Sequence, residues 1–192
     1  MRFGALEILT NDEVYEPRGD SFLLAEFLEG MKDLGDVLDM GTGSGIQALV
    51  ASKNAKNVLG VDVNPEAVKL ARKNAKINGI RNASFVVSDL FENVKEKFDL
   101  IIFNPPYLPV DDKIKGAEQW SCGKNLEIIK RFARDAKNHL KENGNILMVI
   151  SSITGLKGVK KIFEEFEFKV EAVGKKKIPW ETLYILEIKI KS

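Results

Sequence analysis

The sequence has little of what several protein classes require. Its 192 residues include one cysteine, Cys122, and one histidine, so an internal disulfide framework or a cysteine-rich zinc site is excluded and no metal site is expected. No apolar run approaches the roughly 20 residues of a membrane-spanning helix. The segment Met1–Leu9 lacks the basic start and long apolar core of a signal peptide. We therefore expect a cytoplasmic protein with no membrane partner.

The charges nearly cancel, since 29 lysines and arginines face 28 aspartates and glutamates. This balance gives no general attraction to nucleic acid and argues against a nucleic-acid partner. A hydrophobic content of 44% with 30% charged residues is typical of a globular rather than a disordered chain. The length favours one domain over residues 1–192, and no linker-like tract suggests a boundary.

Short apolar runs alternate with helix-like segments, which predicts an α/β fold with a mainly parallel sheet of about seven strands. The expected strands are 36–40, 58–61, 84–87, 100–103, 146–150, 168–173 and 183–190. The expected helices are 21–31, 46–52, 64–78, 125–140 and 159–166. Asn143-Gly144 is expected to stop the fourth helix, with His139 in its last turn. Lys175–Lys177 are expected to form a solvated hairpin turn, and contact with RNA or an acidic partner is the alternative.

A glycine-rich turn, Asp39-x-Gly41-x-Gly43-x-Gly45, connects the first strand to the helix 46–52. Alternate glycines let the backbone pass close to a ligand, and the following helix offers free N–H groups to a carboxylate or phosphate. The spacing differs from the Gly-x-Gly-x-x-Gly of dinucleotide folds. Asp39 would repel a pyrophosphate and attract an ammonium group. The turn thus indicates a zwitterionic ligand, although a tight turn without any ligand is the alternative.

Two further strand ends carry carboxylates. Asp62 ends the second strand, where it could accept hydrogen bonds from both hydroxyls of a ribose. Asp89 and Leu90 follow the third strand and could offer an acceptor and an apolar wall to an adenine. Each could instead be a simple turn residue. Because the ends of parallel strands meet at one edge of a sheet, we expect these sites to share one crevice.

The fourth strand ends in Asn104-Pro105-Pro106-Tyr107. Two prolines leave carbonyls free of sheet hydrogen bonds. The side-chain oxygen of Asn104 and the carbonyl of Pro105 could then accept both hydrogens of one planar NH₂ group, with Tyr107 stacked on it. Alkylating such a nitrogen requires orientation, because its lone pair is delocalised. A proline-rich loop start without chemistry is the alternative.

These motifs resemble those of the S-adenosylmethionine-dependent methyltransferases of the Rossmann-like class. Together with the segment 14–24, they are similar to the HemK-like family, which N5-methylates the glutamine of the Gly-Gly-Gln loop in translation release factors. The lack of an N-terminal helical domain resembles the short archaeal and eukaryotic branch. The resemblance implies a seven-stranded, mainly parallel sheet with helices on both faces and a C-terminal antiparallel strand. Arg18-Gly19 and Ser121-Cys122-Gly123 depart from the family pattern.

The resemblance also implies S-adenosylmethionine as cofactor and a role for each motif residue. The residues implied to bind the cofactor are Asp20, Ser21, Asp39, Gly41, Gly43, Gly45, Asp62, Asp89, Leu90 and Asn104. The residues implied to hold the methyl acceptor are Asn104, Pro105, Pro106 and Tyr107. The implied partners are a release factor as substrate and a small zinc-binding activator protein that covers the strand 84–87.

Other functions fit the same motifs. The acceptor could be a nucleobase amine, in DNA adenine or in RNA, or a protein lysine. The chain could also be a cofactor- or partner-binding module without activity. An intact Asn104–Tyr107 motif argues against that last alternative, because these residues contribute little to folding.

Overall fold

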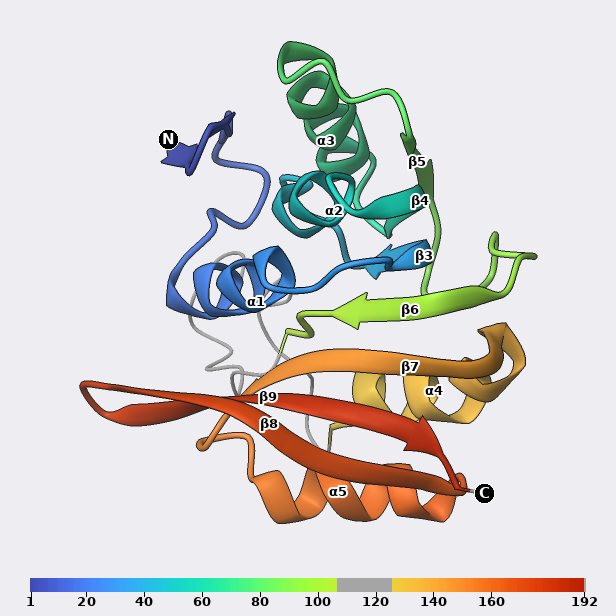
Figure 1. Ribbon diagram of the computed structural model, residues 1–192. Helices are drawn as coiled ribbons and strands as arrows, with labels where there is room; N and C mark the ends of the chain where they lie inside the picture. The colour runs from blue at the N-terminus through green and yellow to red at the C-terminus, as the bar shows by residue number, and fades with distance from the viewer. Residues whose placement is uncertain (107–125, 192) are drawn as a thin grey trace.

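The computed structural model describes residues 1–106 and 126–191. Its centre is a seven-stranded sheet in the order β5-β4-β3-β6-β7-β9-β8 (Figure 1). The first five strands of this order are parallel, while β9 is antiparallel to both β7 and β8. The strands are β3 Gly35–Met40, β4 Ala55–Asp62, β5 Ala83–Val87, β6 Phe98–Phe103, β7 Leu140–Ser151, β8 Phe168–Ile178 and β9 Glu181–Ile190. The expected α/β fold is confirmed.

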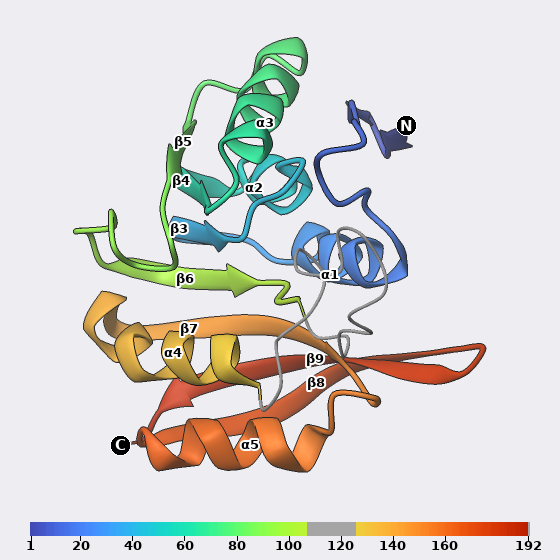
Figure 2. The same cartoon turned by 180° about the vertical axis from the view of Figure 1, so that it is seen from behind.

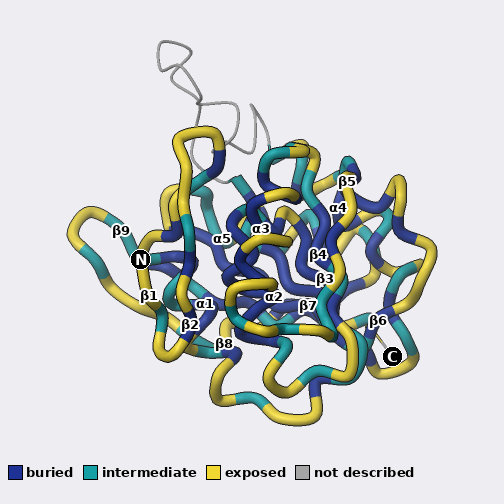
Figure 3. The backbone as a smooth tube through the Cα atoms, turned by 90° about the horizontal axis from the view of Figure 1, so that it is seen from above, coloured by how far each residue is buried: buried dark blue, intermediate teal, exposed yellow. Residues whose placement is uncertain are grey.

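Helices cover both faces of the sheet (Figure 2). They are α1 Gly19–Glu29, α2 Ile46–Ala51, α3 Pro65–Ile77, α4 Glu127–Ala136 and α5 Leu156–Glu165. Side chains alternate across each strand. Leu38 and Ile101 therefore pack with Phe132 of α4 and Phe163 of α5, whereas Val37 joins the apolar layer under α1, α2 and α3. The burial view shows these strands as the buried centre of the molecule (Figure 3).

Helix α3 begins as its sequence predicts. The side chain of Asn64 accepts a hydrogen bond from the backbone N–H of Glu66 at 2.9 Å, and Pro65 occupies the first helical position. A capping side chain satisfies an N–H that the helix itself leaves without a partner, and proline has no N–H there to lose. These local contacts place the end of β4, with Asp62, directly before the helix.

The helix predicted over 125–140 is confirmed over Glu127–Ala136, but its predicted continuation to a stop at Asn143-Gly144 was wrong, and Asn125 lies outside the described residues. Helix α4 ends at Ala136, a 3-10 turn η2 covers Lys137–His139, and Leu140 already begins β7. Strand β7 pairs with β6 on both sides of an irregularity that contains Asn143, whose φ is +65°. A Cβ on Gly144 would lie 2.8 Å from the carbonyl of Phe98, so this position is a close strand approach. Tertiary pairing with β6 overrides the local stop signal here.

Two smaller differences concern the ends of the sequence. Lys175–Lys177 lie in strand β8 rather than in the turn, because the β8–β9 hairpin continues to Ile178. A short hairpin of β1 Arg2–Phe3 and β2 Leu6–Glu7, which the sequence pattern did not predict, precedes α1. Among the described residues, no helix is long and apolar enough to cross a membrane.

Candidate active site

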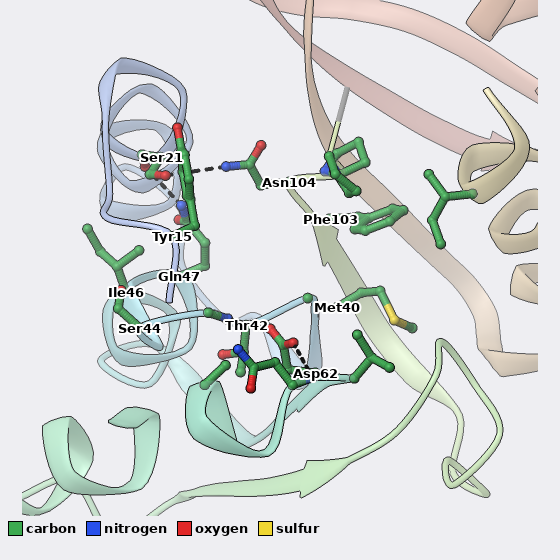
Figure 4. Close-up of a pocket in the computed structure, with 18 of the residues that line it drawn as sticks. Tyr15, Ser21, Met40, Thr42, Ser44, Ile46, Gln47, Asp62, Phe103 and Asn104 are labelled. Atoms are coloured by element: carbon green, nitrogen blue, oxygen red, sulfur yellow. Dashed lines mark hydrogen bonds between the residues drawn. The ribbon is translucent and has the colours of Figure 1, made fainter. Parts of the chain in front are cut away.

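The predicted strand-end motifs meet at one cavity of about 310 Å³ at the carboxyl edge of the sheet (Figure 4). Its walls come from the ends of β3, β4, β5 and β6, from helix α1, and from Ile128 of α4. The predicted site residues that line it are Asp20, Ser21, Gly41, Gly43, Asp62, Asp89, Leu90, Asn104, Pro105 and Pro106. The expectation of a shared crevice is confirmed. Tyr107 lies outside the described residues.

The three glycines of the turn between β3 and α2 have different structural roles. All have positive φ, at +66° for Gly41, +53° for Gly43 and +86° for Gly45. Gly41 and Gly43 line the cavity, and a Cβ on Gly43 would enter open space. Gly45 does not line it, and a Cβ there would lie 3.0 Å from the Cβ of Ala71 on α3. Gly45 thus serves the packing of α2 against α3, and its predicted cofactor contact stays a prediction.

Asp39 is buried behind this turn and does not line the cavity. One carboxylate oxygen accepts hydrogen bonds from Thr42 Oγ1 at 2.6 Å and from the backbone N–H of Ala48 at 3.1 Å. Burial, opposed by these two hydrogen bonds, raises the pKa of Asp39 to about 7. The carboxylate therefore braces the glycine-rich turn, while its predicted contact with an ammonium group stays a prediction.

Asp62 faces the cavity and also holds the turn. Its two oxygens accept hydrogen bonds from the backbone N–H groups of Gly43 and Asn64, each at 2.9 Å. A carboxylate oxygen can accept more than one hydrogen bond, so both retain capacity toward a ligand. Burial raises the pKa of Asp62 above its ordinary value. This geometry suits an acceptor for a pair of neighbouring hydroxyl groups.

The turn after β5 supplies a carboxylate and an apolar wall. Asp89 accepts a hydrogen bond from Arg131 of α4 at 2.8 Å, which ties this turn to the helix whose Ile128 also lines the cavity. Leu90 is buried with φ at +48°, and its carbonyl accepts a hydrogen bond from the buried hydroxyl of Ser88. Sequence reasoning missed Arg131, because it lies 42 residues from Asp89 and carries no local motif.

Asn104 points from the end of β6 across the cavity toward α1 (Figure 4). Its Nδ2 donates to Asp20 Oδ2 at 3.1 Å and to Ser21 Oγ at 3.3 Å. Asp20 also accepts hydrogen bonds from the hydroxyl of Tyr15 at 3.2 Å and from the backbone N–H of Ser21 at 2.7 Å. Burial first, and then the charge of Asp20, raise the pKa of Tyr15, so its hydroxyl remains a donor. Sequence reasoning did not assign Tyr15 a role.

Three buried side-chain atoms have no hydrogen-bond partner within residues 1–106 and 126–191: Ser44 Oγ, Gln47 Oε1 and Asn104 Oδ1. All three residues line this cavity. Burying an unsatisfied polar atom costs about 1–3 kcal/mol, so such atoms gathered in one place indicate a polar ligand. The signal for Gln47 in the sequence is a lone polar residue in the otherwise apolar helix α2, where its Nε2 donates to the carbonyl of Ser21.

Comparison with known proteins identifies the family to which this chain belongs. Residues 18–178 match the family described as methyltransferase small domain, and the chain belongs to this family of enzymes. It is 44% identical, over 94% of both sequences, to a Methanocaldococcus jannaschii protein named "Putative protein N5-glutamine methyltransferase". It is 32% identical to the release factor glutamine methyltransferase of Lactococcus lactis, over 85% of this chain and 65% of that protein, slightly less than two thirds of its length.

Among solved structures, the chain is similar to one in the E. cuniculi Mtq2–Trm112 complex, which is described as methylating the eRF1 translation termination factor. The TM-score is 0.71 at 29% identity, covering 94% of this chain and 99% of that one. The resemblance to HemK-like enzymes that the motifs indicated is confirmed by these relatives.

Proposed function

We propose that this methyltransferase uses S-adenosylmethionine to methylate N5 of a protein glutamine, in the Gly-Gly-Gln loop of a translation release factor. The relatives from M. jannaschii and L. lactis support the glutamine acceptor. The observation that carries the proposal is Asn104: its Nδ2 is held by α1, and its buried Oδ1 has no partner in the described part of the chain. An acceptor atom without a partner is what a planar NH₂ substrate requires.

The cavity fits the cofactor by the chemistry of its lining. Asp62 offers acceptors for ribose hydroxyls, Asp89 and Leu90 an acceptor and an apolar wall for adenine, and Gly41 and Gly43 unobstructed backbone for the methionine end. Ser44 Oγ and Gln47 Oε1 supply further buried polar atoms there. When bound, S-adenosylmethionine supplies an electrophilic methyl group on a sulfonium.

The chain's own residues would prepare the acceptor nitrogen. Asn104 Oδ1 and the carbonyl of Pro105 would each accept one N–H of the substrate amide and so fix the plane of that group. Fixed acceptors also stabilise the positive charge that develops on this nitrogen during alkylation. Asp20 already accepts hydrogen bonds from Tyr15, Ser21 and Asn104, so we assign it to orienting Asn104 rather than to proton abstraction.

The proposal extends to an activator subunit at the edge strand β5. This strand is the outermost of the parallel strands, and Val86 and Val87 are 37% and 40% exposed. An apolar strand edge invites pairing with a strand from another chain. We propose that a small zinc-binding activator pairs here; the E. cuniculi relative was solved with Trm112. Co-expression followed by size-exclusion chromatography tests it, and a Val86→Lys variant that co-elutes as the parent does would contradict it.

The methylation assay uses labelled S-adenosylmethionine, with and without the activator. Release factor, its Gly-Gly-Ala version, nucleic acids and a lysine-rich protein are offered separately. We expect label in the release factor only, and none in the Gly-Gly-Ala version. Label in a nucleic acid or on lysine would overturn the glutamine assignment, and cofactor binding with no transfer at all would indicate a binding module.

A further inference from the structure

The proposed function makes no use of the hairpin arm, which we define as residues 175–181 around the β8–β9 turn. The arm extends beyond the helices and the rest of the sheet in both views (Figures 1 and 2). Its strands stay paired to the tip, with Lys177 opposite Thr182 and Ile178 opposite Glu181. Strand β7 ends at Ser151, opposite Leu183, so the arm projects past this supporting strand beyond the pair of Lys176 and Leu183.

Trp180 occupies the turn at the tip of the arm, and its side chain takes no part in the core. Its side chain is 99% exposed, although an indole is among the largest apolar groups. Its φ is +79°, a conformation that glycine or asparagine adopts at lower cost. A tryptophan that is exposed and also strained has no stabilising role in the isolated chain. Tryptophan is, however, enriched among residues that carry the energy of protein interfaces.

The lysines of the arm separate onto two faces. Lys176 faces α1, where its Nζ lies 3.5 Å from the carboxylate of Glu26. Lys175 and Lys177 lie opposite Tyr184 and Thr182, on the other face of the hairpin. Within the described ranges, neither Lys175 nor Lys177 takes part in an ion pair. These two positive charges lie on the same hairpin as the exposed indole, five and three residues before it in the sequence.

Ile153 adds apolar surface at the base of the arm. It is 52% exposed, and its neighbour Ser152 donates from its backbone N–H to the carbonyl of Thr182 at 2.8 Å. The carboxylate of Glu181 is occupied by a hydrogen bond from the hydroxyl of Ser151. We name the set Ile153, Lys175, Lys177 and Trp180 the docking face. It combines apolar side chains with unpaired positive charge.

The docking face lies at the same edge of the sheet as the cavity. Phe103, the last residue of β6 before Asn104, pairs with Met148, and β7 continues from there to Ser151 and the base of the arm. The base of the arm borders α1, since Lys176 pairs with Glu26 and a Cβ on Gly19 would lie 3.9 Å from the side chain of Leu183. A protein substrate that inserts one side chain into the cavity extends past this edge of the sheet. The part of its surface next to the inserted side chain would therefore contact the arm.

We propose that the docking face binds an acidic, partly apolar surface of the protein substrate, outside the loop that is methylated. This inference rests on the proposed function, because it takes the substrate to be a folded protein. The small number of positive charges on the docking face favours a protein over a nucleic acid as its partner. Nucleic-acid binding commonly neutralises about 6–10 phosphates, whereas the docking face offers only Lys175 and Lys177. Trp180 supplies the apolar contact, and Lys175 and Lys177 pair with acidic side chains on the surface of the substrate.

The test compares two substrates of the same enzyme, with its activator if one is required. One is the intact release factor, and the other is a short peptide of its Gly-Gly-Gln loop, which is too small to reach the arm. The variants are Trp180→Gly and the double variant Lys175→Glu/Lys177→Glu. The matched control is Lys95→Glu/Lys97→Glu, which has the same spacing on an exposed segment before β6.

We expect each arm variant to raise the KM for intact release factor on the order of tenfold, with no change in peptide kinetics or cofactor affinity. Trp180→Gly should leave Tm equal or higher, because glycine relieves the positive φ. The docking face is overturned if both arm variants have the same KM for intact release factor as the parent. It is also overturned if the Lys95→Glu/Lys97→Glu control raises this KM as much as the arm variants do. The proposal is overturned as well if the parent binds an RNA oligonucleotide and only the arm variants lose that binding. If the parent methylates neither substrate, the proposed function fails instead.

Discussion

Asn104 Nδ2 donates a hydrogen bond to Asp20 Oδ2 at 3.1 Å, although the two residues are 84 positions apart in the chain. This contact joins the acceptor motif at the end of β6 to the first turn of α1. An amide has one donor end and one acceptor end, so fixing Nδ2 on Asp20 fixes the direction of Oδ1. The reactive geometry of the site thus depends on both segments.

The first prediction concerns Asn104 itself. Asn104→Ala should reduce turnover roughly a hundredfold or more, because an acceptor prepared for the reacting nitrogen is lost. Single-turnover methylation of release factor measures this, with circular dichroism to show that the fold is intact. A rate within about threefold of the parent would be incompatible with the proposed role.

The second prediction separates orientation of Asn104 from binding. Asp20→Asn, which removes the carboxylate that holds Nδ2, should lower kcat by about tenfold or more, and Tyr15→Phe by a smaller factor. The KM for release factor should change little. Because the pKa of Tyr15 is raised, Tyr15→Phe should not alter the pH profile between pH 6 and about 9. A rise in KM at constant kcat would indicate a binding role instead.

The third prediction concerns the cofactor. Asp62→Ala should weaken S-adenosylmethionine binding by about 1.5–3 kcal/mol, because a carboxylate that accepts from two hydroxyls is removed. Calorimetric titration measures the affinity. Glu164→Ala, on the exposed surface of α5, removes an equal charge far from the cavity and should have no effect. Equal affinities for Asp62→Ala and the parent would exclude the assignment.

The fourth prediction uses the raised pKa of Asp39. The folded state keeps Asp39 protonated up to a pKa of about 7, while the unfolded chain ionises near the ordinary value of 3.8. The folded state thus binds more protons within this window, and the stability contributed by Asp39 falls as pH rises from about 4 to 7. Urea unfolding of the parent and of Asp39→Asn should show the difference in their free energies of unfolding moving by about 2 kcal/mol or more between pH 5 and pH 8.

The control for this comparison is the Asp39→Asn variant, whose amide does not titrate but keeps an acceptor oxygen for Thr42 and Ala48. Other groups contribute equally to both proteins and cancel in the difference. A difference that is constant with pH would show that the carboxylate of Asp39 titrates in the folded protein as it does in the unfolded one.

The sequence by itself determined the alternation of strands and helices and the residues at the strand ends. Hydrophobic periodicity, the cap at Asn64 and the glycines with positive φ are local properties, and each is written in a few consecutive residues. The convergence of Gly41, Asp62, Asp89 and Asn104 could also be predicted, because parallel strands place their carboxyl ends at one edge.

Only the tertiary structure decided which way those side chains face and what holds them. The end of α4 at Ala136 depends on pairing between β7 and β6, and the partners of Asn104 and Asp89 come from α1 and α4. Gly45 and Asp39 belong to the same motif as Gly41, yet packing turns one toward α3 and buries the other behind the turn. Contacts between distant segments leave no local pattern, because they exist only once the chain has folded.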